Sequence, residues 1–325
     1  NGRQTNPTVT ALQDKISVME NGSATVAFST GMAAIGSTLF SLLRKGDHLI
    51  SSSYLFGNTN SLFSSFATHG IDVSLVDATS VNAVASEIRK NTKMVFVETI
   101  ANPRTQISDL KRIGELCKDH ELVFFVDNTM TTPYLFQPKD VGASLSINSL
   151  TKYIGGHANA LGGSVTELDN YDWNNFPNIY DIYKVGDSSS WAITQIKKKG
   201  LRDFGAALGP EAAHHISVGS DTLALRMDRA CSNAKEITPN TNIEFDNPRL
   251  IASPINETSE MTGNKSFQTT LTFNTESENL SPVLDTQRMG LFAIQNRLNN
   301  LALLTNKQNH NKQNIKNCTV LVVSS

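Results

Sequence analysis

The sequence has few cysteines, no long hydrophobic run and no excess of one charge, and each shortage excludes a class of protein. Its three cysteines, Cys117, Cys231 and Cys318, are far apart and form no CxxC or Cys/His pattern. A disulfide framework or a zinc site is therefore not expected, and a reducing cytoplasm is favoured. The formal net charge of −2 gives no electrostatic case for binding nucleic acid or an acidic membrane. No apolar run approaches the roughly 18 residues that a bilayer span needs.

Apolar residues make up 39% of the 325-residue chain, which is enough for a sizeable core. We expect a large domain at residues 1–210 and a smaller α+β domain at 211–325, where apolar periodicity fades and asparagine and glutamine accumulate. The chain opens on Asn1-Gly2-Arg3 without a signal-peptide layout, and we expect its N-terminal arm to be incomplete. Residues 168–183, rich in aromatic, Asn and Asp residues, are predicted to form a surface excursion.

Short β-rich runs alternate with amphipathic stretches from Ala24 to Val165, which predicts a parallel sheet with helices on both faces. The predicted strands are Ala24–Phe28, His48–Ser51, Asp72–Val76, Met94–Glu98, Leu122–Asp127 and Ala143–Asn148. The predicted helices are Met32–Leu43, Thr59–His69, Val81–Lys90 and Leu110–Lys118. A helical pattern returns at Ala206–Arg229, with a break at Gly209-Pro210. In such sheets a ligand lies beyond the carboxyl ends of the strands, so chemistry is expected there.

Two ionisable residues follow predicted strands. Lys152, in Ser-Leu-Thr-Lys-Tyr, comes after the strand that ends near Asn148, and burial there would free its amine to form an imine. Asp127 ends an apolar strand, where its carboxylate could hold the proton of a heterocyclic nitrogen. Taken alone, such a lysine is usually a solvated surface residue, and such an aspartate is usually a cap or turn residue.

Weaker signals follow other predicted strands. Ser-Thr-Gly-Met-Ala-Ala around Gly31 opens a helix whose free amides could bind a phosphate, although this pattern is also ordinary capping. Ser149 and Thr151 could add hydroxyl donors. Phe56 could stack on a planar ring, but an aromatic there is more often part of the core. Asn102 could donate to a phenolate oxygen, or serve an Asn-Pro turn.

These candidates supply together the five groups that a pyridoxal-phosphate (PLP) site needs. The five are an amine, a carboxylate for the pyridine nitrogen, a phosphate cradle, a ring stack and a donor to the phenolic oxygen. Each signal is weak alone, but all five occur in order at predicted strand ends. The sequence therefore predicts a PLP site.

Ser149-Leu150-Thr151-Lys152-Tyr153-Ile154-Gly155-Gly156-His157 resembles the lysine motif of the Cys/Met-metabolism PLP enzymes. This family includes cystathionine synthases and lyases, methionine γ-lyase and O-acetylhomoserine sulfhydrylase. Ser-Thr-Gly-Met-Ala-Ala, Glu98–Pro103 and Asp127-Asn128-Thr129 resemble its other blocks in the same order, and the resemblance runs from Arg3 to about Ala234. It implies the PLP-dependent type I (aspartate aminotransferase-like) fold, an α/β architecture with a mostly parallel sheet flanked by helices.

The resemblance also implies a role for each matching residue. Lys152 would be the Schiff-base lysine and the base that moves the Cα proton, Asp127 would hold the pyridine nitrogen, and Asn102 the phenolic oxygen. The remaining implied cofactor contacts are Gly31, Met32, Phe56, Thr129, Ser149, Thr151 and Arg3. Arg3 would reach the phosphate of a neighbouring subunit, which implies a homotetramer built of dimers with shared active sites.

Within the family, Tyr171-Asp172-Trp173, Leu201–Ala206 and Thr222–Met227 are most similar to O-acetylhomoserine sulfhydrylases. The implied reaction is γ-replacement, in which O-acetylhomoserine and sulfide or a thiol give homocysteine or a thioether plus acetate. Methionine or cystathionine γ-lyase is the alternative.

Three positions depart from the family pattern. Asn1 stands where the family commonly has tyrosine, and Phe56 stands where the stacking residue is often tyrosine. Cys318-Thr319-Val320-Leu321 falls where an arginine usually binds the substrate carboxylate, and no arginine follows Arg297. A PLP-fold protein with impaired catalysis therefore stays a second hypothesis.

A third hypothesis comes from another class of enzyme. Ser149 to Lys152 also fits SxxK, the nucleophile motif of penicillin-binding proteins. That mechanism needs a KTG-like partner downstream, and the sequence contains none.

Overall fold

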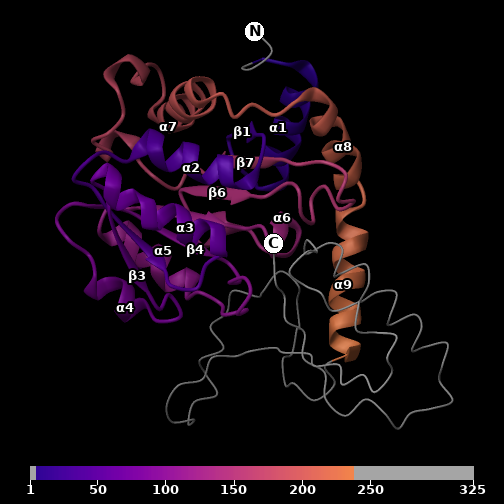
Figure 1. Cartoon of the computed structure of the whole chain (residues 1–325), viewed down its shortest axis with the longest axis horizontal. Helices are drawn as coiled ribbons and strands as arrows, with labels where there is room; N and C mark the ends of the chain where they lie inside the picture. Colours follow the sequence, from indigo (N-terminus) through magenta and orange to yellow (C-terminus); the bar gives the residue numbers. More distant parts are fainter. Residues whose placement is uncertain (1–4, 238–325) are drawn as a thin grey trace, which may run out of the picture.

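Seven strands pair into one sheet in the order β1-β7-β6-β5-β4-β2-β3 (Figure 1). The structure is a computed structural model that describes residues 5–237. The strands are β1 (Ala24–Phe28), β2 (His48–Ser52), β3 (Asp72–Val76), β4 (Thr92–Glu98), β5 (Val123–Asp127), β6 (Leu145–Asn148) and β7 (Gly163–Glu167). The six strands predicted from the sequence are confirmed within a few residues at their ends.

The sheet is mostly parallel. Strands β6, β5, β4, β2 and β3 pair in parallel, whereas β7 runs antiparallel to β6 and to β1. The predicted α/β class is therefore confirmed. Strand β7 was not predicted, because Val165 is its sole strongly apolar residue, although all five of its residues are buried.

The helices are α1 (Pro7–Met19), α2 (Gly31–Leu42), α3 (Gly57–Phe66), α4 (Val81–Ser86), α5 (Leu110–Asp119), α6 (Thr132–Leu135), α7 (Trp191–Gln195), α8 (Pro210–Ser220) and α9 (Leu223–Ile237). Short 3₁₀ turns are η1 (Ala67–His69), η2 (Pro138–Val141), η3 (Trp173–Asn175), η4 (Asp181–Tyr183) and η5 (Ser188–Ser190), and η6 (Ile196–Asp203) is a π-helix. The predicted helices are present, although α4 ends at Ser86, earlier than expected. None of the helices described at residues 5–237 combines the length and apolarity that crossing a membrane requires.

The alternation of side chains along the strands separates the core into layers. On β5, Val123 and Phe125 pack with α2 and α3, whereas Phe124 and Val126 pack with α5. Figure 1 shows α2 and α4 on opposite sides of the strands. Because the period along a strand is two, Asp127 shares the α2 side of the sheet with Phe125.

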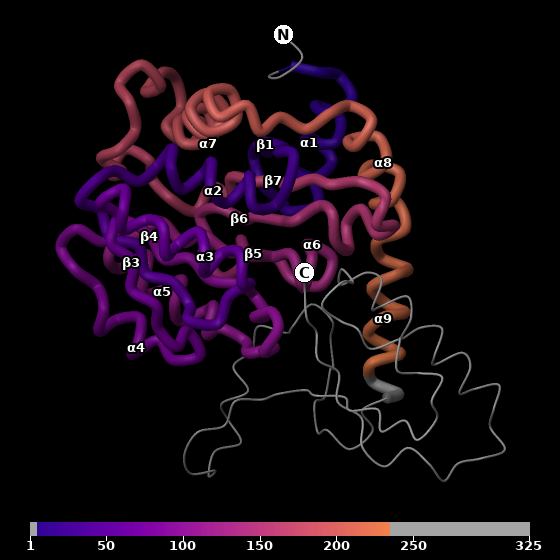
Figure 2. The backbone as a smooth tube through the Cα atoms, viewed as in Figure 1, coloured from indigo at the N-terminus to yellow at the C-terminus, as the bar shows by residue number. Residues whose placement is uncertain are grey.

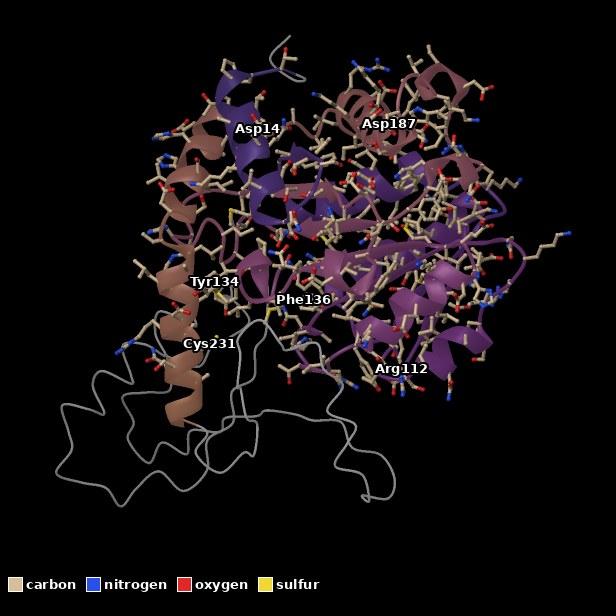
Figure 3. All side chains as sticks on the ribbon, turned by 180° about the vertical axis from the view of Figure 1, so that it is seen from behind. Asp14, Arg112, Tyr134, Phe136, Asp187 and Cys231 are labelled. Atoms are coloured by element: carbon tan, nitrogen blue, oxygen red, sulfur yellow. The ribbon has the colours of Figure 1, made fainter. Side chains whose placement is uncertain are left out.

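A third apolar cluster joins the two ends of the described chain. Leu12 and Ile16 of α1 pack with Ala213 and Ile216 of α8, and the two helices lie side by side in Figure 2. Figure 3 shows Tyr134 of α6 next to the helix that carries Cys231, and the Tyr134 hydroxyl donates to Asp228 of α9 at 2.8 Å. The beginning of the predicted second domain thus packs on the first. The rest of residues 211–325 lies outside the described residues, so that domain stays a prediction.

The segment at residues 168–183 is not simply a surface excursion, and that prediction is wrong for Trp173 and Phe176, whereas Tyr180 is exposed. Trp173 is fully buried, and its Nε1 donates to Glu167 at 3.1 Å. Phe176 and Ile179 are also buried in the α2-side core. The Asn and Asp residues between them form short turns, which gave the segment its loop-like composition.

Candidate active site

A cavity lies at the carboxyl ends of β4, β5 and β6, where α2 and α3 begin. Its empty space is about 580 Å³, including open solvent at its mouth. Eight of the residues that were predicted to contact a cofactor line it: Gly31, Met32, Phe56, Asn102, Asp127, Thr129, Ser149 and Lys152. Residues from five segments that are separate in sequence therefore meet at the carboxyl ends of the strands, as expected for such a sheet.

Lys152 lies in the turn after β6. Its backbone N–H donates to Ser149 O at 3.1 Å, and its side chain forms part of the cavity wall. Within residues 5–237 the amine has no hydrogen-bond or ion-pair partner. Burial lowers its pKa, because a desolvated ammonium is disfavoured. The amine is thus more readily uncharged, the form that attacks an aldehyde.

The turn that carries Lys152 is fixed from α9. The guanidinium of Arg226 donates to Ile154 O at 3.3 Å and to Tyr153 O at 2.5 Å. It also donates to Gly219 O of α8 at 2.9 Å, so one side chain ties both helices to the lysine turn. Gly156 suits this turn because its φ is +73°, a conformation that favours glycine, and a Cβ atom there would also displace the Arg226 guanidinium.

Asp127 occupies the cavity floor at the end of β5. One of its oxygens accepts the Thr129 N–H at 2.9 Å, and the Thr129 hydroxyl oxygen accepts the Ser149 N–H at 2.8 Å. Desolvation raises the pKa of Asp127 to about 6, which hydrogen bonds from Thr129 partly oppose. A cationic partner in the cavity would favour the charged carboxylate and lower that pKa.

Helix α2 begins at the same cavity. Thr30 is its N-cap, with its hydroxyl oxygen accepting the Ala33 N–H at 3.0 Å. Gly31 packs so closely on β6 that a Cβ atom would lie 2.8 Å from the Ser149 Cβ. The free N–H groups of this first turn and the helix dipole favour an anion at this end of the cavity.

Phe56 and Asn102 enter the cavity from the loops after β2 and β4. Phe56 is the N-cap residue of α3 and is partly buried. Asn102 is nine-tenths buried, and within residues 5–237 its Oδ1 has no hydrogen-bond partner. A buried amide with unmet hydrogen-bonding capacity in a cavity wall is suited to a polar ligand atom.

Thr151 and Arg3 are placed differently. The Thr151 hydroxyl donates to Gly162 O at 3.2 Å and accepts from Gly162 N at 3.0 Å, and Thr151 is not among the residues that line the cavity. Arg3 lies outside the described residues, as do Asn1, Arg297 and the segment at Cys318. Their implied roles stay predictions.

Six further residues line the cavity: Ile35, Thr59, Glu98, Ile100, Met130 and Ile147. Glu98 is the notable one, because it is buried and pairs in register with Asp127 on the neighbouring strand. Desolvation, and then the charge of Asp127, raises the pKa of Glu98 to about 8. Its position at the end of a predicted strand, on the same parity as the buried Phe96, is the sequence signal that identifies it.

The profile of the Cys/Met metabolism PLP-dependent enzyme family matches residues 1–289. The chain belongs to this family. It is 37% identical over 235 residues to an L-methionine gamma-lyase of Fusobacterium nucleatum subsp. polymorphum, covering 71% of this chain and 54% of that protein. It is 33% identical to the homocysteine synthase of Schizosaccharomyces pombe, with 71% and 57% covered. The chain thus spans about half the length of the curated relatives it matches.

A crystal structure assigned as an O-acetylhomoserine (thiol)-lyase of Campylobacter jejuni subsp. jejuni superposes with a TM-score of 0.68 and 30% identity. The match covers 73% of this chain and 62% of that one, which contains N'-pyridoxyl-lysine-5'-monophosphate. The predicted type I fold follows from family membership. The family does not support the SxxK interpretation of Ser149 to Lys152.

The donor set of the cavity fits the cofactor of the family. An amine with no partner among residues 5–237, a desolvated carboxyl group, a helix N-terminus, an aromatic ring and a buried side-chain amide all border the same space. Within residues 5–237 no group of three His, Cys, Asp or Glu side chains could hold a metal ion.

Proposed function

We propose that the chain binds PLP through Lys152 and catalyses γ-replacement on O-acetylhomoserine. Sulfide or a thiol would displace acetate from Cγ and give homocysteine or a thioether. The observation that carries this proposal is the desolvated Lys152 amine, which has no partner within residues 5–237 and shares one cavity with Asp127. Family membership and the relatives named as sulfhydrylases and as a homocysteine synthase support it.

Each residue of the cavity has a task in this proposal. PLP, when bound, withdraws electrons from the substrate carbon atoms next to the amino group. Lys152 would hold the cofactor through its aldehyde, and its amine would move protons at the substrate Cα and Cβ. Asp127 keeps a proton on the pyridine nitrogen, because a facing carboxylate stabilises the charged form.

The other predicted contacts orient the ring. The first turn of α2, with Gly31, Met32 and Ser149, binds the phosphate group. Phe56 packs on the ring face, and the Asn102 amide faces the phenolic oxygen. Rigid contacts to the ring matter because a displacement of the reacting atoms by about 1 Å can lower the rate about 10²-fold.

The covalent part of the proposal has a direct test. The full chain is incubated with PLP, reduced with borohydride and digested, and the modified peptide is sequenced by mass spectrometry. We expect a yellow protein that bleaches on reduction and a pyridoxyl group on Lys152. A colourless protein, or a label spread over surface lysines, would refute the assignment.

The reaction has a separate test. Homocysteine formation is measured with O-acetylhomoserine and sulfide, with each substrate omitted in turn as a control. We expect product when both are present. Labelled Lys152 without turnover would instead support the hypothesis of impaired catalysis.

L-Methionine γ-elimination is the second candidate function. Five relatives at 32% to 37% identity carry the name L-methionine gamma-lyase, and each is covered over 54% of its length. Release of a keto acid, ammonia and methanethiol from methionine without an added thiol would favour it over γ-replacement. The homotetramer and the cytoplasmic location stay predictions.

A further inference from the structure

Glu98 bridges two loops that enter the cavity from different strands. Its Oε1 accepts the backbone N–H of Phe56 at 2.7 Å, and its Oε2 accepts the backbone N–H of Asn102 at 3.0 Å. Phe56 follows β2 and Asn102 follows β4, and these strands are neighbours in the sheet. One carboxylate therefore fixes the two residues proposed to stack on the ring and to face its phenolic oxygen.

The bridge is placed where water competes little with it. Glu98 is 5% exposed, and the Ser108 hydroxyl donates to its backbone oxygen at 3.0 Å. A hydrogen bond buried away from water is electrostatically stronger than an exposed one, because the local dielectric constant is low. Both loops are thereby held relative to the end of β4, and to Asp127 on the adjacent strand.

Burying a second carboxyl group beside Asp127 is unfavourable, so the position needs a compensating interaction. Desolvation and the charge of Asp127 both raise the Glu98 pKa. The two backbone N–H groups oppose that shift, because they stabilise the ionised form. A Leu or Met would fill the same volume without the electrostatic cost, but neither could accept these N–H groups.

We propose that Glu98 is a positioning residue of the cofactor site, which acts by clamping the backbones of Phe56 and Asn102. The inference rests on the proposed function, since it concerns how that site holds its cofactor. It requires no contact between Glu98 and the reacting atoms. Loss of the two Glu98 hydrogen bonds should weaken binding of the cofactor ring, whereas Lys152 should still form its covalent bond to the cofactor.

The test uses pyridoxine 5'-phosphate, which has the ring and phosphate but no aldehyde. Its binding is measured by calorimetry on the PLP-free full chain, so Lys152 chemistry does not contribute. In Glu98→Gln an NH₂ group replaces one acceptor oxygen, and we expect roughly tenfold weaker binding, as for the loss of one buried hydrogen bond. Glu167→Gln is the matched control, because Glu167 is also buried but pairs with Leu145 at the start of β6, at the end of the strands opposite the cavity.

A double-mutant cycle separates positioning from general destabilisation. If Glu98 acts through the Phe56 ring, Glu98→Gln should weaken binding less in a Phe56→Leu background than in the wild type. The same cycle with Glu167→Gln should be additive. Glu98→Asp, which keeps the carboxyl group but is too short to reach both loops, supplies a second variant if Glu98→Gln does not fold.

The outcomes distinguish the inference from the function on which it rests. Wild-type binding with an unchanged affinity in Glu98→Gln and Glu98→Asp would overturn the clamp alone. Additive effects of Glu98→Gln and Phe56→Leu would overturn it as well. Failure of the wild type to bind either PLP or pyridoxine 5'-phosphate would overturn the proposed function and the clamp together.

Discussion

Two polar networks share the ends of β5 and β6, and they differ in their access to a ligand. On the α2 side of the sheet, Asp127 and Ser149 line the cavity. On the opposite side, the adjacent residues Asn128 and Asn148 donate their side-chain amides to Glu20 Oε1, at 3.2 Å for Asn128. The Ser146 hydroxyl donates to the same oxygen at 3.1 Å, and Glu20 is fully buried.

Because side chains alternate along a strand, neighbouring polar residues face opposite sides of the sheet. Asp127 and Ser149 face the cavity, whereas Asn128 and Asn148 face Glu20. The Glu20 network joins the end of α1 to the ends of β5 and β6, and none of its residues lines the cavity. Within residues 5–237, Glu20 Oε2 and Asn148 Oδ1 have no hydrogen-bond partner. The cavity network leaves the Lys152 amine and the Asn102 amide oxygen unpartnered within residues 5–237. Substitutions on the cavity side should therefore change cofactor binding and turnover, whereas substitutions in the Glu20 network should change the free energy of unfolding.

Lys152→Ala should have the largest effect. We expect loss of the lysine-bound cofactor absorbance and a fall in turnover of about 10³-fold or more, because both the covalent link and the proton shuttle are removed. Lys139→Ala is the control, since the Lys139 amine donates to Asn21 O, away from the cavity. Retained absorbance and turnover in Lys152→Ala would contradict the proposal.

Asp127→Asn should come next. The amide keeps the size of the side chain but cannot stabilise a pyridinium proton, so turnover should fall by about 10² to 10³-fold. Borohydride should still attach the cofactor to Lys152, because the amine is untouched. Wild-type turnover with intact cofactor would show that Asp127 does not face the ring nitrogen.

Glu20→Gln should change the pH dependence of folding rather than cofactor binding. Burial raises the pKa of Glu20 to about 7 from about 4.5. The folded state therefore retains a proton that the unfolded state loses, and the free energy of unfolding falls as pH rises from about 4.5 to about 7. In the wild type this decrease should be about 3 kcal/mol, and in Glu20→Gln it should be absent.

The measurement is the free energy of unfolding, by urea denaturation, from pH 4.5 to 8. The difference between the two proteins should shift in favour of Glu20→Gln as pH rises and stay constant above about pH 7. A difference that does not vary with pH would show that Glu20 has an ordinary acidity. Affinity for PLP should be similar in both proteins.

Phe56→Leu should have the smallest effect. Leucine keeps an apolar contact and the backbone N–H that Glu98 accepts, but it removes the ring stack. We expect roughly 2- to 10-fold weaker binding of PLP, as for the loss of one aromatic contact. Phe40→Leu, a change within the cluster around Phe66, should leave affinity unchanged. Equal affinities of Phe56→Leu and wild type would exclude a stack at this position.

The elements with a strong local pattern could be predicted, and those defined by distant contacts could not. Six strands and four helices follow from periods of two and of three to four residues, which report which side chains face the core. Strand β7 lacks an apolar pattern because it carries buried polar residues. The Thr166 hydroxyl forms a hydrogen bond with the Thr25 hydroxyl of β1 at 2.8 Å, and the Glu167 carboxyl group accepts one from Trp173. The partners of Thr166 and Glu167 come from other segments, which local sequence does not reveal.

By itself the sequence determined the order of the strand-end residues and their chemistry, because strand periodicity and residue type are local properties. The tertiary structure decided that β4 lies between β2 and β5, which brings Glu98 within reach of Phe56 and beside Asp127. It also decided that the Thr151 hydroxyl turns to Gly162 rather than to the cavity. These contacts join segments that are far apart in the sequence. Their distance along the chain does not predict that they meet, because strand order in a sheet depends on how the whole chain packs.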